Sequence, residues 1–424
     1  MAISSYIDDP EAQLALHQRT LSVVMASQVF SGAGLAAGVT VGALLTEQML
    51  GSSAFAGVPA ALYAGGSAIA ALTVGRLSQR LGRRAGLAAG YAAGTLGGVG
   101  VVVAAGLDSV VLLFVSLLVY GAGTATNLQA RYAGTDLSGP HRRGRAVSSV
   151  LVTTTVGAVI GPNLVAATGR AAENFALPAL AGPFALAAVA YAIAGLILFL
   201  LLRPDPLLVS QAMQARQARE AMQAMQAQAG PATAATAPRS PAGVTAGAAT
   251  MILTQLVMVA VMTMTPVHMQ NHGHDLAATG LVISLHIAAM YLPALVTGIL
   301  VDRVGRVPVA VASGVTLLAA GLVSATAAED SVAQLALALI LLGVGWNLGL
   351  VSGTAMISDA APIEQRARIQ GNVDLCIALA GAGGGIASSL VMSATSYATL
   401  SIAGGLLGLA MIPFVAAGAR PSRA

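Results

Sequence analysis

The chain of 424 residues is 56% hydrophobic and only 8% charged, with a formal net charge of +4 and a mean hydropathy of +0.81. Average protein sequences contain roughly a quarter charged residues, so this composition excludes a soluble globular protein and predicts a polytopic membrane protein. All 20 residues counted as Lys+Arg are arginine, and most of them lie in short loops between apolar segments. That pattern indicates membrane topology rather than nucleic-acid binding.

The single cysteine, Cys376, lies inside an apolar run, so an intramolecular disulfide is excluded and a buried thiol is expected. The first residues, Met1–Thr20, include Asp8, Asp9 and Glu11 and have no cationic region. We therefore interpret the first apolar run as a retained helix and not as a signal peptide.

A helix that spans a membrane needs about 20 mostly apolar residues. Twelve such segments follow one another along the chain: Leu21–Leu45, Ala54–Val74, Ala85–Leu107, Val110–Tyr132, Ala146–Ala167, Leu177–Leu202, Ala246–Met269, Leu276–Val301, Val307–Thr326, Val332–Ser358, Ile369–Ala394 and Ala398–Ala417. The fold class predicted is an all-α membrane protein with twelve transmembrane helices.

The apolar segments follow one another with short connections except once, between the sixth and seventh segments, where a long polar stretch intervenes. Residues 211–226 are strong helix formers, whereas residues 230–241 are rich in Pro, Ala and Thr and are typical of a disordered linker. We therefore predict an N-terminal six-helix bundle at residues 1–202, a partly disordered linker at 203–247 and a C-terminal six-helix bundle at 248–424.

The arginines between these segments favour one side of the membrane. That side holds Arg19, Arg76, Arg80, Arg83, Arg84, Arg142, Arg143, Arg145, Arg203, Arg216, Arg219, Arg239, Arg303, Arg306, Arg366, Arg368, Arg420 and Arg423. Arg131 lies near the same side inside the fourth segment, and Arg170 lies on the other side. The positive-inside rule then predicts that both termini are cytoplasmic.

A short basic loop occurs twice. Gly75–Leu87 recurs as Gly298–Ala310, 223 residues later. The same offset relates Gly75 to Gly298, Arg80 to Arg303, Gly82 to Gly305, Arg83 to Arg306, Arg143 to Arg366 and Arg145 to Arg368. Repetition at a fixed offset indicates a duplicated chain, with two halves related by a pseudo-twofold axis.

The pattern Gly-x-x-x-Asp-Arg-x-Gly-Arg at Gly298–Arg306 resembles the loop signature of the major facilitator superfamily. In the first copy, Gln79 stands where that family usually has Asp. The resemblance covers essentially the whole chain. It implies two six-helix halves that move a small molecule by alternating access through a site between them. It also implies that Asp302 caps a helix of the opposite half and latches one face closed, and that Asp302 matters more than the uncharged Gln79.

The fifth segment contains Gly157, Gly161 and Pro162, which resemble the Gly-x-x-x-Gly-Pro core found in drug–proton antiporters of that superfamily. The alternative is an ordinary packing face of small residues. Those antiporters usually carry an arginine four residues before a glycine in the fourth helix, but Leu117 stands four residues before Gly121 here. The resemblance therefore favours export while arguing against proton coupling by the family's usual route.

Ionisable residues inside a membrane are costly and usually functional. Asp374 in the eleventh segment is the best candidate for a protonatable switch, the alternative being a static pair with Arg368 or a helix N-terminus. Arg131 is a second coupling candidate. His286 in the eighth segment either titrates or binds substrate, or is a hydrogen-bonded packing residue.

Polar residues on the helices that line the cavity in the resembled family are the cavity candidates: Gln28, Asn127, Gln129, Gln255, Trp346 and Asn347. Each has an interhelical hydrogen bond as its alternative role. A cluster of His268, His272 and His274 beside Asp275 suggests a zinc site, although Gly273 interrupts the helix and hydrated loop histidines explain the cluster as well.

The prediction that follows is a monomeric transporter in the bacterial inner (plasma) membrane that exports a small, amphiphilic molecule in exchange for protons, without a cofactor. The alternatives are an uptake symporter for a nutrient or metal-linked solute, and a non-transporting receptor on the same fold. An enzyme is not expected, because the chain lacks His-Glu-x-x-His, Gly-x-Ser-x-Gly and phosphate-loop motifs.

Overall fold

The computed structural model describes residue 6 and residues 9–50, 58–227, 241–274 and 276–419. Within these residues the chain is helical, with no strand. The first half of the chain forms α2 (Pro10–Leu50), α3 (Val58–Leu81), α4 (Arg83–Gly106), α5 (Val110–Thr135), η2 (Pro140–Arg142), α6 (Arg143–Asn163), α7 (Val165–Glu173), η3 (Ala179–Ala181), α8 (Gly182–Leu201) and α9 (Pro206–Ala227). The second half forms α10 (Pro241–Asn271), α11 (Leu276–Tyr291), α12 (Ala294–Arg303), α13 (Arg306–Ala325), α14 (Val332–Ala360), α15 (Arg366–Ala394), α16 (Tyr397–Leu409) and α17 (Met411–Ala419).

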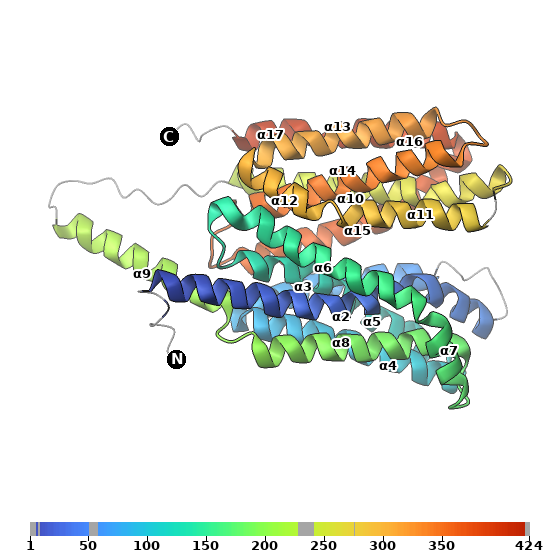
Figure 1. The fold of residues 1–424 in the computed structure, drawn as a ribbon, viewed down its shortest axis with the longest axis horizontal. Helices are drawn as coiled ribbons and strands as arrows, with labels where there is room; N and C mark the ends of the chain where they lie inside the picture. The colour runs from blue at the N-terminus through green and yellow to red at the C-terminus, as the bar shows by residue number, and fades with distance from the viewer. Residues whose placement is uncertain (1–5, 7–8, 51–57, 228–240, 275, 420–424) are drawn as a thin grey trace.

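The helices form two bundles that lie side by side with their long axes roughly parallel (Figure 1). One bundle contains α2–α8 and the other α10–α17, and α3 and α6 pack against helices of the second bundle. The first bundle has an aromatic core in which Tyr120 contacts both Phe184 and Tyr191. A second core cluster contains Trp346 and is formed mainly by the second bundle, with Val147 and Leu151 of α6 added from the first.

Nine helical segments of the described residues are long and apolar enough to cross a membrane. The other three predicted spans correspond to α2, α3 and α6, which are helices of 41, 24 and 21 residues. The architecture therefore agrees with the predicted twelve spans in two bundles.

Three predicted spans are broken rather than continuous. The fifth divides into α6 and α7 at Leu164, just beyond Pro162. The eighth divides into α11 and α12 around Pro293, whose ring cannot donate a backbone hydrogen bond. The twelfth divides at Ala410, with Pro413 in the first turn of α17, where a missing N–H is tolerated.

The segment between the bundles begins with α9, which extends beyond the end of the bundles (Figure 1). It covers the predicted helix-forming stretch at 211–226. The predicted linker stretch at 230–241 lies outside the described residues except for Pro241, where α10 begins five residues before the predicted start at Ala246.

The prediction of a buried thiol was wrong. Cys376 is exposed on α15, where Leu379, Ile386 and Leu390 are also exposed. A helix in lipid presents apolar residues outward as well as inward, so an apolar context does not imply burial in the protein.

Candidate functional site

The two repeated loops lie at one end of the molecule, which we call the arginine-rich end. Gly82 connects α3 to α4 with φ of 91°, and Gly305 connects α12 to α13 with φ of 105°. Residues other than glycine rarely adopt a positive φ of this size, because the Cβ atom would clash with the backbone, so glycine is required at both turns. Each turn starts the next helix at the arginine that follows, Arg83 or Arg306.

The first glycine of each loop permits a close crossing between the two bundles. A Cβ atom on Gly75 would lie 2.8 Å from the Cα of Gly371 on α15. A Cβ atom on Gly298 would lie 2.5 Å from the Ser148 hydroxyl on α6 and 2.7 Å from the Gly144 carbonyl oxygen. The two crossings, α3 with α15 and α12 with α6, are related by the repeat.

Asp302 caps a helix of the opposite bundle. Its Oδ1 accepts a hydrogen bond from the backbone N–H of Gly144 at 2.9 Å, and its Oδ2 accepts one from Arg145 at 3.1 Å. The Asp302 side chain is 1% exposed. The carboxylate therefore neutralises the positive N-terminal end of α6, as the family resemblance implied.

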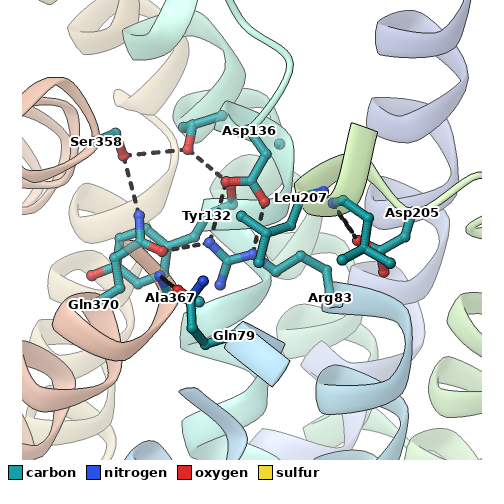
Figure 2. Close-up of polar contacts among 12 residues, drawn as sticks. Gln79, Arg83, Tyr132, Asp136, Asp205, Leu207, Ser358, Ala367 and Gln370 are labelled. Carbon is teal, nitrogen blue, oxygen red and sulfur yellow. Dashed lines mark hydrogen bonds and ion pairs between the residues drawn. The ribbon is translucent and has the colours of Figure 1, made fainter. Parts of the chain in front are cut away.

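Gln79 forms the equivalent contact in the first loop (Figure 2). Its Oε1 accepts from the backbone N–H of Ala367 at 2.8 Å, in the first turn of α15, and its amide donates to the Ile363 carbonyl at 3.4 Å. The uncharged amide thus satisfies the same kind of backbone donor but brings no negative charge to it.

Behind each cap lies an ion pair, which is buried in the first half and partly exposed in the second. Arg83 Nε donates to Asp136 Oδ2 at 2.7 Å, and the same guanidinium donates to Gln370 of the opposite bundle (Figure 2). In the second half, Arg306 Nε donates to Asp359 Oδ2 at 2.8 Å, and Asp359 also binds Arg143 of the first half.

The carboxylates of these pairs were missed in the sequence, although Asp136 and Asp359 are 223 residues apart and share the offset of the arginines. The other arginines that the two loops share, Arg80 and Arg303, are exposed and form no ion pair within the described part of the chain.

Arg131 on α5 and Asp374 on α15 form an ion pair across the interface between the two bundles. Arg131 Nη2 lies 2.7 Å from Asp374 Oδ1, and the two side chains are 0% and 2% exposed. Tyr132 donates to the same carboxylate oxygen at 3.2 Å, and Arg131 Nε donates to Thr354 at 3.1 Å. The structure therefore brings two of the predicted coupling residues together.

The predicted alternative partner, Arg368, does not pair with Asp374. It is exposed near the start of α15 and lines a surface pocket with Arg76, Arg80 and Glu364. Its failure to reach Asp374 follows from helix geometry, because residues six positions apart are 600° apart in rotation and lie on different faces.

Repeat-related residues meet at this interface. Arg131 contacts Thr354, and Thr135 lies 3.3 Å from Ser358. In each of these two pairs the residues are 223 positions apart in the sequence, which is the offset of the repeat. The pseudo-twofold axis of the duplication therefore passes between α5 and α14, next to the Arg131–Asp374 pair.

Most cavity candidates bond within one bundle. Asn127 donates to Gln28 Oε1 at 2.6 Å, and Gln28 donates to the Asn127 carbonyl at 3.0 Å. Gln129 donates to the Ala71 carbonyl and Asn347 to the Met290 carbonyl, both at 2.7 Å. For these four residues the structure places the side chain in an interhelical hydrogen bond.

Gln255 and Trp346 belong to an aromatic group near the interface. The indole N–H donates to Gln255 Oε1 at 2.8 Å, and Tyr291 packs edge-on against the Trp346 ring at 5.7 Å between centroids. From the opposite half, Tyr63 shares a hydrogen bond with Thr124 and lies near Tyr291. The sequence reasoning missed Tyr63 and Tyr291, since tyrosines within apolar runs carry no distinguishing signal.

His286 is fully buried, and its Nδ1 hydrogen-bonds the Leu339 carbonyl oxygen at 2.8 Å. The contact joins α11 to α14 inside the second bundle. His286 lies apart from the Arg131–Asp374 pair, and its contact is of the kind expected of a packing residue.

The histidine cluster lies at the end opposite the arginine-rich end. His268 stacks on Tyr397, His272 Nε2 lies 3.6 Å from Glu329, and His274 bonds the Glu329 carbonyl. In the described part of the chain no group of three histidine, cysteine or acidic residues is arranged to hold a metal ion. Asp275 lies outside the described residues.

The small residues of the fifth span pack against the first. A Cβ atom on Gly157 would lie 2.0 Å from the Val29 carbonyl oxygen, so α6 and α2 depend on glycine there for their close approach. Gly161 and Pro162 belong to α6, but their surroundings lie outside what the structure describes.

Comparison with known proteins agrees with this architecture. A family model described as Major Facilitator Superfamily matches residues 21–290 and 247–424. The chain is 56% identical over 414 residues to the MFS-type transporter YdeG of Bacillus subtilis, covering 98% of this chain and 95% of the relative. It is 27% identical over 363 residues to the riboflavin transporter RfnT of Brucella anthropi, covering 84% and 85%. The structure of the human organic anion transporter MFSD10 superposes with a TM-score of 0.74 at 15% identity, covering 94% of this chain and 99% of that chain.

The two helical bundles and these matches define a multi-pass membrane transporter. Because such proteins move molecules without converting them, the prediction that the chain is not an enzyme is confirmed. The chain belongs to the Major Facilitator Superfamily. The predicted all-α fold of two six-helix halves is confirmed with it.

Proposed function

We propose that this protein is a proton-coupled exporter of small amphiphilic molecules in which the Arg131–Asp374 pair couples proton binding to opening of the arginine-rich end. The observation that carries the proposal is that the pair is buried and joins opposite halves. A charge pair in that position favours the conformation in which the halves are in contact, and neutralising the carboxylate removes that preference.

The orientation of the protein in the membrane is inferred from the positions of its arginines. Six of the 20 arginines lie at the ends of α3 and α12 and in the turns that follow them, and Arg142, Arg143, Arg145, Arg366 and Arg368 lie at the same end of the bundles. We therefore assign the arginine-rich end to the cytoplasm of a bacterial inner membrane, with both termini on that side. The polar contacts between the halves, within the described residues, all lie toward this end. The structure then corresponds to the conformation closed to the cytoplasm.

The coupling step follows from this state. A proton that reaches Asp374 from outside leaves Arg131 with neutral partners, namely Thr354, Tyr132 and the Leu128 carbonyl. The cytoplasmic end then opens, the proton leaves to the lower proton concentration inside, and substrate binds from the cytoplasm. Return to the closed form restores the ion pair, so each cycle exchanges an inward proton for an outward substrate.

The substrate class is suggested by the aromatic group. Tyr63, Tyr291 and Trp346 offer aromatic surfaces near the interface, and Gln255 and Thr124 offer neutral polar groups. Such a surface favours flat, uncharged or weakly charged molecules with an aromatic ring. The relative named as a riboflavin transporter supports a planar substrate.

The test is accumulation of fluorescent aromatic compounds, neutral and cationic, in cells that express the protein, with and without a protonophore. Asp374→Asn is compared with Asp330→Asn, which removes an exposed carboxylate at the opposite end. We expect accumulation to fall at least severalfold with the unaltered protein and with Asp330→Asn, and to return to control with the protonophore or with Asp374→Asn.

Gradient-dependent accumulation above control would instead indicate an uptake symporter, with the same coupling residue working in the opposite direction. Transport that is unchanged in Asp374→Asn would contradict the assigned role of Asp374.

A further inference from the structure

A groove of about 740 Å³ lies on the outer surface of the first bundle, between α3, α4 and α8. Its lining is almost wholly apolar, and Leu81, Leu96 and Phe199 along its edges are 59%, 69% and 44% exposed. Exposed apolar residues of this kind on a membrane protein contact acyl chains, so the groove faces lipid and not the space between the bundles.

The groove results from the sequence of α4. Ala85, Ala88, Ala89 and Ala92 follow the spacing of one helix face and present only methyl groups there. Larger side chains on α3 and α8 stand on both sides, so the alanine face forms the floor of a trough that runs along the helix. Gly195 keeps α8 close to α4, since a Cβ atom there would lie 3.2 Å from Tyr91.

One end of the groove is positively charged. The Arg84 guanidinium stacks over the ring of Phe199, which lines the groove, at 5.0 Å from the ring centroid. No carboxylate lies within ion-pair distance of this guanidinium among the residues that the structure describes. The Arg84 guanidinium is therefore held by Phe199 at one end of the apolar groove, where it can bind an anion.

The backbone at Arg84 is also fixed. Asp205 accepts from the Arg84 N–H at 2.7 Å. It also accepts from the Leu207 N–H at 3.0 Å (Figure 2), so it ties the start of α4 to the start of α9. The neighbouring residue Arg83 points the other way, to Asp136 and Gln370. Arg84 and the contact between the two halves therefore share one rigid turn.

We propose that this groove binds an anionic phospholipid, with one acyl chain on the alanine face and the phosphate on Arg84. The charge complementarity rests on the proposed cytoplasmic position of the arginine-rich end, because anionic lipids are concentrated at that surface. The repeat has Val307 at the position equivalent to Arg84, so the site belongs to the first half alone. A phosphate bound there stabilises the turn that carries Arg83, and with it the closed arginine-rich end.

The experiment is competition between phosphatidylglycerol and phosphatidylcholine for the purified protein in detergent, read by native mass spectrometry and by thermal unfolding. Three variants are compared: Arg84→Gln removes the charge, Ala89→Leu fills the groove, and Arg219→Gln removes an exposed arginine on α9 as a matched control. The readouts do not require transport, so they are independent of the success of the proposed function.

We expect phosphatidylglycerol to be retained in preference to phosphatidylcholine by the unaltered protein and by Arg219→Gln. Arg84→Gln should reduce that preference about fivefold, the effect of one basic residue at an anionic surface. Ala89→Leu should reduce retention of both lipids. Equal retention of the two lipids by the unaltered protein, or an unchanged preference in Arg84→Gln, overturns the proposal. Full lipid retention in Ala89→Leu overturns the groove as the site.

Discussion

The guanidinium of Arg131 and the carboxylate of Asp374 lie 2.7 Å apart in the buried interface between two halves of one duplicated chain. Removing one member of such a pair is costly, about 3–5 kcal/mol, because the other charge remains buried without compensation. The pair therefore stabilises only the conformation in which the arginine-rich ends of the two bundles are in contact. The predictions below separate its role from those of the caps and the packing residues around it.

The two helix caps should contribute unequally to closure. Asp302 brings a full charge to the N-terminus of α6, whereas Gln79 brings only a dipole to α15. We expect Asp302→Asn to weaken the closed conformation by about 1 kcal/mol, and Gln79→Glu to strengthen it by a few tenths to about 1 kcal/mol.

Alkylation of a cysteine at Ser148, in a Cys376→Ser background, measures closure because Ser148 is buried against Gly298. Faster alkylation in Asp302→Asn and slower alkylation in Gln79→Glu are expected. Equal effects of Asp302→Asn and Gln79→Ala would contradict the unequal latch.

A methyl group at Gly75 should force the bundles apart. The nearest atoms, the Gly371 Cα at 2.8 Å and the Ala367 carbonyl oxygen at 2.9 Å, are backbone atoms that cannot rotate away. Overpacking of this kind costs about 1–3 kcal/mol, so Gly75→Ala should increase alkylation at position 148 and reduce transport. Gly383→Ala on α15 is the control, since its Cβ would meet nothing within 4 Å. Similar behaviour of the two variants would show that the crossing does not limit closure.

His286 should affect stability without affecting coupling. Its ring joins α11 to α14 through the Leu339 carbonyl, inside one bundle. We expect His286→Leu to lower the free energy of unfolding by about 0.5–1.5 kcal/mol, since one buried side-chain hydrogen bond between two helices is lost. The pH dependence of the transport rate should keep its shape. A shifted pH profile in His286→Leu would assign His286 to the coupling pathway.

The histidine cluster should not hold zinc. His268 stacks on Tyr397 and His272 faces a single carboxylate, and neither arrangement supplies the three or four converging ligands that zinc requires. Isothermal titration of zinc into the purified protein should give the same affinity before and after replacement of His268 and His272 by alanine. Loss of a stoichiometric site on replacement would show that the histidines converge in another conformation.

The sequence predicted the fold because hydrophobic length, arginine asymmetry and the repeated loop all act over long stretches of chain. It also led to Asp302, since the family resemblance assigns a cap to that position. The pairing of Arg131 with Asp374 was not predicted, because it joins residues 243 positions apart whose helix faces cannot be read from uniformly apolar segments. For the same reason Gln28 and Asn127 resembled cavity residues, although they bond to each other within one bundle.

The most direct test of the account is the distance between the two halves at the arginine-rich end, measured by pulsed electron paramagnetic resonance between spin labels at His141 and Val304. Both positions are exposed and lie on opposite halves, and Cys376→Ser removes the native thiol. If the charge of Asp374 holds this end closed, Asp374→Asn shifts the distribution to longer distances at neutral pH, and acidification does the same to the unaltered protein. Identical distributions in the two proteins at every pH would contradict the account.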